Sequence, residues 1–132
     1  MDKIIRGFLV DVVGDKGADV TVFADNLSNI YKMLNVDLID VTERRIGSFT
    51  YDIVCDDEVL FKPDNLPSAF NEKQEAQLVG SLLLVNHDDE GNFASLTNEQ
   101  IEDLKKHLCV AMFNYKDGKT KVYKVLMGVE YA

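Results

Sequence analysis

AQLVGSLLLVNHDDEGNFASLTNEQIEDL, residues 76–104, is the stretch that decides the fold, because strand, turn and helix patterns follow one another within it. The apolar run at residues 78–85 is too short to cross a membrane and apolar enough to be covered on both faces, which predicts a central strand. The polar residues 87–92 then predict a turn. Thr97 and Gln100 have the spacing of a capping box at a helix start, where side chain and backbone satisfy free N–H groups reciprocally. Leu96 and Ile101 flank this box as a hydrophobic staple.

The segments before this stretch predict a hairpin and a short helix. Residues 4–13 and 18–23 are rich in branched and apolar side chains and are separated by a glycine-containing turn, which predicts two paired strands. Asp25 is the predicted N-cap of the helix that follows. Asn35 is predicted to end this helix, since asparagine tolerates the left-handed conformation at a helix end.

A second hairpin is predicted between this helix and the central strand. Residues 36–42 have a strand pattern, residues 43–48 are predicted to turn, and residues 49–55 alternate between apolar and polar side chains. Two prolines and mixed polar residues then predict an irregular loop over residues 62–77, since proline donates no hydrogen bond to a sheet. A long irregular loop in a compact domain is either mobile or functional.

A third hairpin is predicted after the capped helix, over residues 109–115 and 120–127. Asp117-Gly118 between them favours a type I′ turn, which needs positive φ at both central residues. Lysines in this hairpin are predicted to keep an edge strand from pairing with another chain; they are Lys116, Lys119, Lys121 and Lys124. The predicted fold class is therefore α+β, a mostly antiparallel sheet built from hairpins with two short helices packed on it.

Length and composition predict a single globular domain over residues 1–132, with a core at 4–107 and an additional C-terminal hairpin at 109–127. The 132 residues, 46% of them hydrophobic, can bury a core without a metal or disulfide. The two cysteines, Cys55 and Cys109, lie in apolar segments without metal-site or redox-pair spacing, so buried free thiols are expected. No leader and no long apolar run is present, which predicts a cytoplasmic protein that does not enter a membrane.

The negative charge is concentrated in the first four-fifths of the chain. Residues 1–104 carry 21 acidic and 8 basic side chains, a net charge of −13, whereas residues 105–132 carry 2 acidic and 6 basic side chains, a net charge of +4. A field of this sign repels phosphate backbones and attracts basic surfaces. The sequence therefore disfavours direct nucleic acid binding by the body of the protein, and favours a partner protein with a basic surface.

Two acidic clusters are the candidate interaction surface: Asp56, Asp57 and Glu58, and Asp88, Asp89 and Glu90. Neither has the alternating ligands and closing glutamate of a calcium loop, so no metal site and no cofactor is predicted. The two histidines lie at a strand end and a helix end, and nothing in the sequence places His87 or His107 beside a nucleophile. No catalytic residue is therefore predicted. Asp64 and its neighbour Asn65 are candidate ligand contacts in the irregular loop.

Five segments together resemble a known family. They are YDIVCDDE at residues 51–58, KPDN at 62–65, LVG at 78–80, DDEGNF at 88–93 and SLT at 95–97. In this order they are similar to a family of small uncharacterised domains encoded on plasmids, phages and integrative elements of Gram-positive gut bacteria. The similarity covers about residues 4–107. It implies a mobile-element setting in a bacterial cytoplasm, and it transfers no catalytic residues.

Two functions from different classes follow as hypotheses. The first is a non-enzymatic acidic protein that occupies a basic surface of a host protein, as inhibitors that imitate DNA do. Electrostatic attraction would then accelerate association and make it sensitive to salt. The alternative is a small-ligand or nucleotide-binding domain that uses the loop at residues 62–77.

Overall fold

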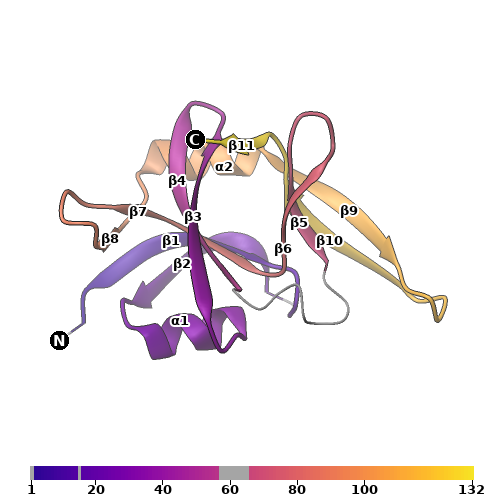
Figure 1. Ribbon diagram of the computed structural model, residues 1–132, viewed down its shortest axis with the longest axis horizontal. Coiled ribbons are helices and arrows are strands. Elements are labelled where there is room, and N and C mark those ends of the chain that lie inside the picture. Colours follow the sequence, from indigo (N-terminus) through magenta and orange to yellow (C-terminus); the bar gives the residue numbers. More distant parts are fainter. Residues whose placement is uncertain (1, 15, 57–65) are drawn as a thin grey trace.

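The computed structural model describes residues 2–14, 16–56 and 66–132 (Figure 1). Within them the chain forms two helices, α1 (Leu27–Leu34) and α2 (Asn98–Lys106), and a set of mostly antiparallel strands. The strands are β1 (Ile4–Asp11), β2 (Gly17–Ala24), β3 (Ile39–Ile46), β4 (Phe49–Asp56), β5 (Pro67–Phe70), β6 (Ala76–Val79), β7 (Leu82–His87), β8 (Phe93–Ala94), β9 (Leu108–Asn114), β10 (Thr120–Leu126) and β11 (Val129–Tyr131). This is an α+β architecture. Neither helix is long and apolar enough to cross a membrane.

The strands form two sheets. The larger sheet has the order β11-β3-β4-β7-β1-β2, with β8 paired to β7, and the smaller sheet has the order β6-β5-β10-β9. All pairings in the larger sheet are antiparallel, whereas β10 and β5 in the smaller sheet are parallel at Leu126 and Ala69. In Figure 1 the smaller sheet stands beside the larger one, and the β9–β10 hairpin extends away from the body.

Each face of the larger sheet is covered by a different element. One face packs against α2 and the smaller sheet in a core that includes Tyr51, Leu84, Leu104 and Leu126. The opposite face packs against α1 in a second core; it contains Ile5, Leu9, Phe23, Ile30, Leu34, Val54, Leu83 and Val85. The central strand β7 contributes to both cores because its successive side chains point to opposite faces. This explains why it reads as a continuous apolar run.

The predicted strand at residues 78–85 is two strands in different sheets. Gly80 has a φ of +79° between β6 and β7, a conformation that glycine adopts without steric cost. Its N–H donates to the Leu66 carbonyl over 2.9 Å. The chain therefore leaves the smaller sheet and enters the centre of the larger one at this glycine, and β7 occupies the predicted central position.

The predicted turn at residues 43–48 is also wrong, because β3 continues through Ile46. The turn is confined to Gly47 and Ser48. β3 is extended because it pairs along its length with β4 and, at its end, with the unpredicted strand β11. The Arg44 guanidinium lies 4.2 Å from the ring centroid of Tyr131, which adds a cation–π contact to that pairing.

The described part of the predicted loop at residues 62–77 is mostly a pair of strands joined by a short turn. Residues 62–65 lie outside the described residues, and residues 67–79 form an antiparallel pair, β5 and β6. Pro67 is tolerated because it occupies the first position of its strand. The connecting turn is fixed by Asn71, whose side-chain oxygen accepts hydrogen bonds from the N–H groups of Lys73 and Glu75.

The turn between β9 and β10 is not the predicted type I′. Gly118 has a φ of +89°, but Asp117 does not have a positive φ, so the two-residue turn is excluded. Instead the Tyr115 N–H donates to Lys119 and the Gly118 N–H donates to Tyr115. Lys116, Asp117 and Gly118 thus form a three-residue loop that ends in a left-handed glycine.

Two of the hairpin lysines, Lys121 and Lys124, belong to β10, which pairs with β9 over residues 120–126 and with β5 only at Leu126. The Lys121 Nζ atom donates to the Val12 carbonyl over 2.6 Å, which ties the hairpin to the larger sheet. That these lysines keep a strand edge from pairing with another chain stays a prediction.

The helix ends agree with the sequence except at one residue. The capping box is present, because Thr97 accepts from the Gln100 N–H and Gln100 accepts from the Thr97 N–H. Asn35 ends α1 in the left-handed conformation, as predicted. The N-cap of α1, however, is Asn26 and not Asp25, since the Asn26 side chain accepts from the Asn29 N–H over 2.8 Å.

Candidate functional site

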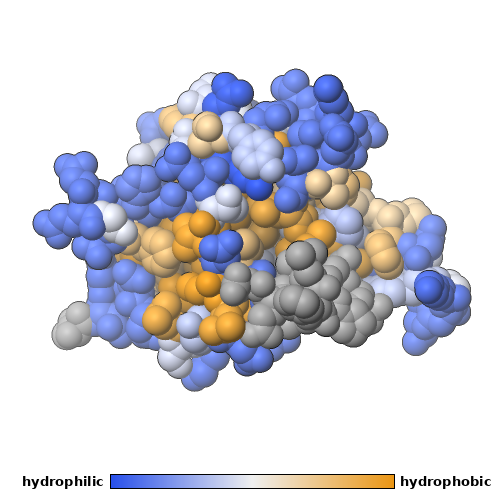
Figure 2. Space-filling model, in the orientation of Figure 1, coloured by the Kyte–Doolittle hydropathy of each residue, from blue (hydrophilic) through white to orange (hydrophobic). Residues whose placement is uncertain are grey.

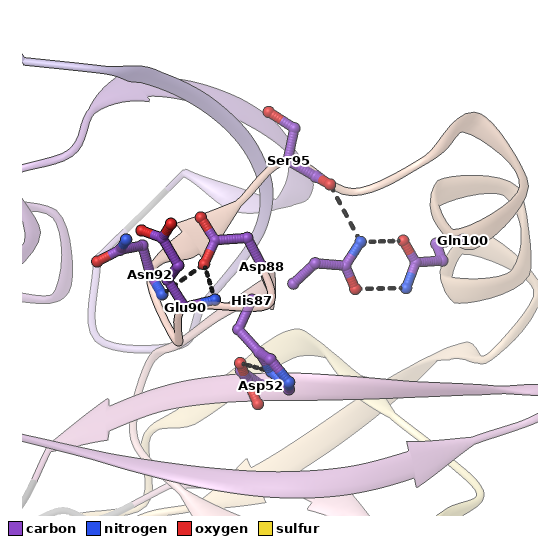
Figure 3. A network of polar contacts seen from close by, with 8 residues as sticks. Asp52, His87, Asp88, Glu90, Asn92, Ser95 and Gln100 are labelled. Atoms are coloured by element: carbon purple, nitrogen blue, oxygen red, sulfur yellow. Dashed lines mark hydrogen bonds and ion pairs between the residues drawn. The ribbon is translucent and has the colours of Figure 1, made fainter.

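Three side chains that can bind cations meet on the α1-side face of the larger sheet: Glu43, Asp52 and His87, here called the His87 cluster. One ligand atom from each lies within 4.8 Å of the others. The His87 Nδ1 atom lies 2.6 Å from Asp52 Oδ2 (Figure 3). Asp52 is buried, whereas Glu43 and His87 are exposed, so the cluster opens to solvent.

Strand register explains why these residues meet. Glu43 in β3 is directly opposite Asp52 in β4, and Asp52 is opposite Val85 in β7. His87 is two residues beyond Val85, so it lies on the same face of the sheet. Tyr51 and Ile53 on either side of Asp52 point into the other core, which fixes the direction of the Asp52 carboxylate.

The carboxylates around His87 stabilise its protonated form. The hydrogen bond from His87 to Asp52 and the negative charge of Asp52 raise the pKa of His87, and the charges of Glu43 and Asp88 act in the same direction. Since the imidazole is half exposed, solvent screens these interactions. The cluster therefore combines one imidazole with carboxylates that favour its protonated form.

The β7–β8 turn adds further acidic groups beside this cluster. The Asp88 carboxylate accepts hydrogen bonds from the N–H groups of Glu90 and Asn92, both over 2.9 Å. Hydrogen bonds from Asn92 and Glu90 hold the pKa of Asp88 below its ordinary value. Asp89 and Glu90 are exposed at the tip of the turn. In Figure 3 this turn lies next to His87, and Figure 2 shows that this end of the molecule is hydrophilic.

The turn is held against α2 by an amide pair. Asn86 and Gln100 exchange two side-chain hydrogen bonds, of 2.6 and 2.8 Å. Asn86 also donates to the Ser95 carbonyl (Figure 3). Gln100 thus caps its own helix and fixes β7 at the same time, which accounts for its burial. These bonds hold the end of β7, from which the acidic turn starts, against α2.

The structure describes one of the two predicted acidic clusters in full and the other only in part. Asp88, Asp89 and Glu90 form the turn just described. Asp56 is only 7% exposed, so it contributes little to a surface. Four other predicted site residues, Asp57, Glu58, Asp64 and Asn65, lie outside the described residues. Glu43 and Asp52 are not among the site residues predicted from the sequence. The signal for Asp52 is that its acidic side chain lies on the same face of the alternating strand as Val54.

The second histidine lies in a separate hollow. A pocket of about 420 Å³ is lined by His107 and Cys109 together with charged residues. They are Lys106 at the end of α2, Arg45 in β3, Glu72 in the β5–β6 turn and Glu130 in β11. The His107 Nδ1 atom lies 2.8 Å from the Asp103 carbonyl. Cys109 is exposed and Cys55 is partly exposed, so the prediction of buried thiols is wrong.

Comparison with known protein families finds one family that matches most of the chain. A family model described as "Domain of unknown function (DUF3846)" matches residues 5–109. The chain belongs to this family. No curated protein and no solved structure matches the chain. The DUF3846 match agrees with the predicted resemblance to a family of domains of unknown function, and it contains the whole His87 cluster. It ends at Cys109, so the β9–β10 hairpin beyond Cys109 lies outside the match.

Proposed function

We propose that this DUF3846 protein is a non-enzymatic binding protein whose acidic surface around His87 occupies a basic surface of another protein. The supporting observation is that Glu43, Asp52 and Asp88, which come from different segments, all act electrostatically on His87. Asp89 and Glu90 extend the same surface into solvent. Convergent negative charge attracts a basic partner and accelerates its association.

The partner class follows from the charge. A net charge of −9 for the whole chain disfavours nucleic acid and favours a protein that itself carries a basic groove. The sequence resemblance to mobile-element proteins suggests a bacterial host protein as the partner, in a cytoplasmic, counter-defence setting. Nucleic-acid-binding proteins of the host fit this description because their binding surfaces are basic.

The test compares two variants with equal loss of charge. Glu43→Gln/Asp89→Asn/Glu90→Gln removes three carboxylates from the acidic surface, and none of these three side chains is needed for a hydrogen bond within the described residues. Glu72→Gln/Glu75→Gln/Glu99→Gln removes three exposed carboxylates elsewhere. Each protein is used to capture partners from bacterial lysate at low salt in the presence of a chelator. We expect a basic protein to be captured by the wild type and by the second variant, lost by the first variant, and released by raised salt.

Two outcomes contradict the proposal. One is that the wild type captures no basic protein at low salt. The other is that the two triple variants lose capture equally, which would show that only net charge matters and that the surface around His87 has no particular role.

A small-ligand function is the second candidate, and the pocket beside His107 favours it. Its volume of about 420 Å³ is within the range of ligand sites. Its lining includes Arg45, Lys106 and His107, together with Glu72 from the β5–β6 turn. A thermal-shift screen with nucleotides and inorganic phosphate tests this function. A ligand-dependent rise in melting temperature that Lys106→Ala removes would support it, and no shift with any compound would contradict it.

A further inference from the structure

Two carboxylates of the larger sheet are placed where they repel each other. Glu43 and Asp52 are directly opposite on adjacent antiparallel strands. Like charges in such a pair destabilise a sheet unless a cation lies between them. His87 in β7 brings an imidazole nitrogen to the same two carboxylates, with one ligand atom of each residue within 4.8 Å of the others.

The ligand atoms of the His87 cluster would have to move only a short distance to hold an ion. Nitrogen and oxygen ligands lie about 2.0–2.2 Å from a zinc ion, so neighbouring ligand atoms are about 3–3.5 Å apart in a tetrahedral site. The Nδ1 to Oδ2 distance of 2.6 Å needs to widen by less than 1 Å if an ion replaces the shared proton. Glu43 already lies within 4.8 Å of the other two ligand atoms, and its exposed side chain is free to move closer.

Asp52 distinguishes this site from a cluster of exposed acidic side chains. Its side chain is only 11% exposed, and His87 is its single side-chain partner in the part of the chain that the structure describes. A buried carboxylate is costly unless it is paired with a positive charge or coordinates a metal. The strand places this carboxylate beneath the imidazole, with Glu43 at its side.

We propose that Glu43, Asp52 and His87 bind a divalent transition-metal ion of the zinc class. Carboxylate and imidazole together suit this class, whereas magnesium and calcium favour all-oxygen sites. Three protein ligands leave at least one coordination position open to water. This site does not depend on the acidic-surface function, because it concerns the isolated protein.

The experiment uses the two histidines as internal reporters. The full chain, in a Cys109→Ser background that removes the exposed thiol near His107, is freed of metal with a chelator and titrated with Zn²⁺. Imidazole signals are followed by NMR and the affinity is measured by calorimetry. We expect Zn²⁺ to shift the His87 signals at one equivalent and to leave the His107 signals unchanged. Glu43→Gln and Asp52→Asn are each expected to weaken binding at least about 10-fold.

The control is Asp89→Asn/Glu90→Gln, which removes neighbouring charge but no ligand. We expect this variant to bind Zn²⁺ within about 3-fold of the starting protein, since exposed charges at a distance are screened. Thermal unfolding without metal checks that each variant is folded. The proposal is overturned if His107 responds first, if Glu43→Gln binds normally, or if the control loses as much affinity as Glu43→Gln.

Discussion

Ser81 connects the end of β1 to the start of β7 in the larger sheet. It is 2% exposed, and its hydroxyl donates to Asp11 over 2.9 Å while accepting from the N–H groups of Val12 and Val13. The Ser81 hydroxyl thus bonds to Asp11, Val12 and Val13, and neither histidine takes part in these hydrogen bonds. Through these hydrogen bonds the hydroxyl holds the end of β1 next to the start of β7.

Ser81→Ala is therefore expected to destabilise the protein by about 1–3 kcal/mol, because it leaves buried donors without an acceptor. Chemical denaturation followed by circular dichroism measures this loss. Ser28→Ala is the control, since Ser28 is exposed in α1, and it should change the free energy of unfolding by less than about 0.5 kcal/mol. Equal effects of the two variants would show that the Ser81 network contributes nothing to stability.

Asp11 gives this network a pH dependence. Burial alone would raise the pKa of its carboxyl group, but hydrogen bonds from the Gly14 N–H, the Ser81 hydroxyl and the Lys16 N–H outweigh burial and hold the pKa below the ordinary value of 3.8. A carboxyl group with a lowered pKa contributes stability above its unfolded-state pKa, and this contribution disappears as the pH falls below that value.

We expect the free energy of unfolding to fall more steeply below pH 4 in the wild type than in Asp11→Asn, which has no carboxyl group to protonate at this position. Denaturant titrations at several pH values between 5 and 2.5 measure the two slopes. Parallel pH profiles would contradict the assigned role of Asp11.

At the scale of the element, α1 offers a direct test of which residue caps it. Asn26→Ala should destabilise the protein by about 1 kcal/mol because it removes the acceptor for the Asn29 N–H. Asp25→Ala should have a much smaller effect, since the Asp25 carboxylate does not cap the helix. Urea denaturation of the two variants provides the comparison. A larger loss of stability for Asp25→Ala than for Asn26→Ala would show that Asp25 caps the helix, as the sequence predicts.

Local signals were predictable and non-local pairings were not. The box formed by Thr97 and Gln100 depends on residues three apart, so spacing alone predicts it. Asp25 and Asn26 are both good caps, and only the path of the chain decides between them. The apolar neighbours of Gly80 predict a continuous strand. The role of Gly80 depends on the presence of a second sheet, which no local pattern reveals.

The same difference between local signals and non-local pairings applies to the candidate site. The Asp88 turn was predictable, since its polar and glycine residues follow an apolar run. The His87 cluster requires three strands in a definite register, and the sequence placed Glu43 in a turn. One extra turn residue would have moved Glu43 to the other face, because side chains alternate along a strand. The metal-ligand arrangement could therefore be recognised only after β3 was shown to continue through Ile46.

At the scale of the whole molecule, β9 is an unusually open edge. It has seven residues, none of them charged, and within the described chain it pairs only with β10. Val110 and Met112 on β9 are 70% and 67% exposed, and Val122 opposite Met112 is 60% exposed. Other edges are shorter, as in β6 and β11, or carry a charge, as β2 does at Asp19. Proteins usually protect edge strands by these means.

We expect two copies to associate through β9 at high protein concentration. An antiparallel pairing centred on Ala111 would place Val110 of one copy opposite Met112 of the other, with no like charges opposed on the paired strands. Met112→Lys should abolish this association, because it introduces a charge at the centre of the edge. Light scattering coupled to size-exclusion chromatography measures the molecular mass. Val22→Lys on the edge strand β2, where Val22 is 64% exposed, is the matched control and should associate like the wild type.

Salt separates this association from binding to a basic partner. Each copy carries a net charge of −9, so two copies repel at low ionic strength, and raised salt should strengthen their pairing. Raised salt should weaken the binding of the acidic surface to a basic protein, because that attraction is screened. A wild type that remains monomeric at millimolar concentration in both low and high salt would show that the β9 edge does not pair with itself.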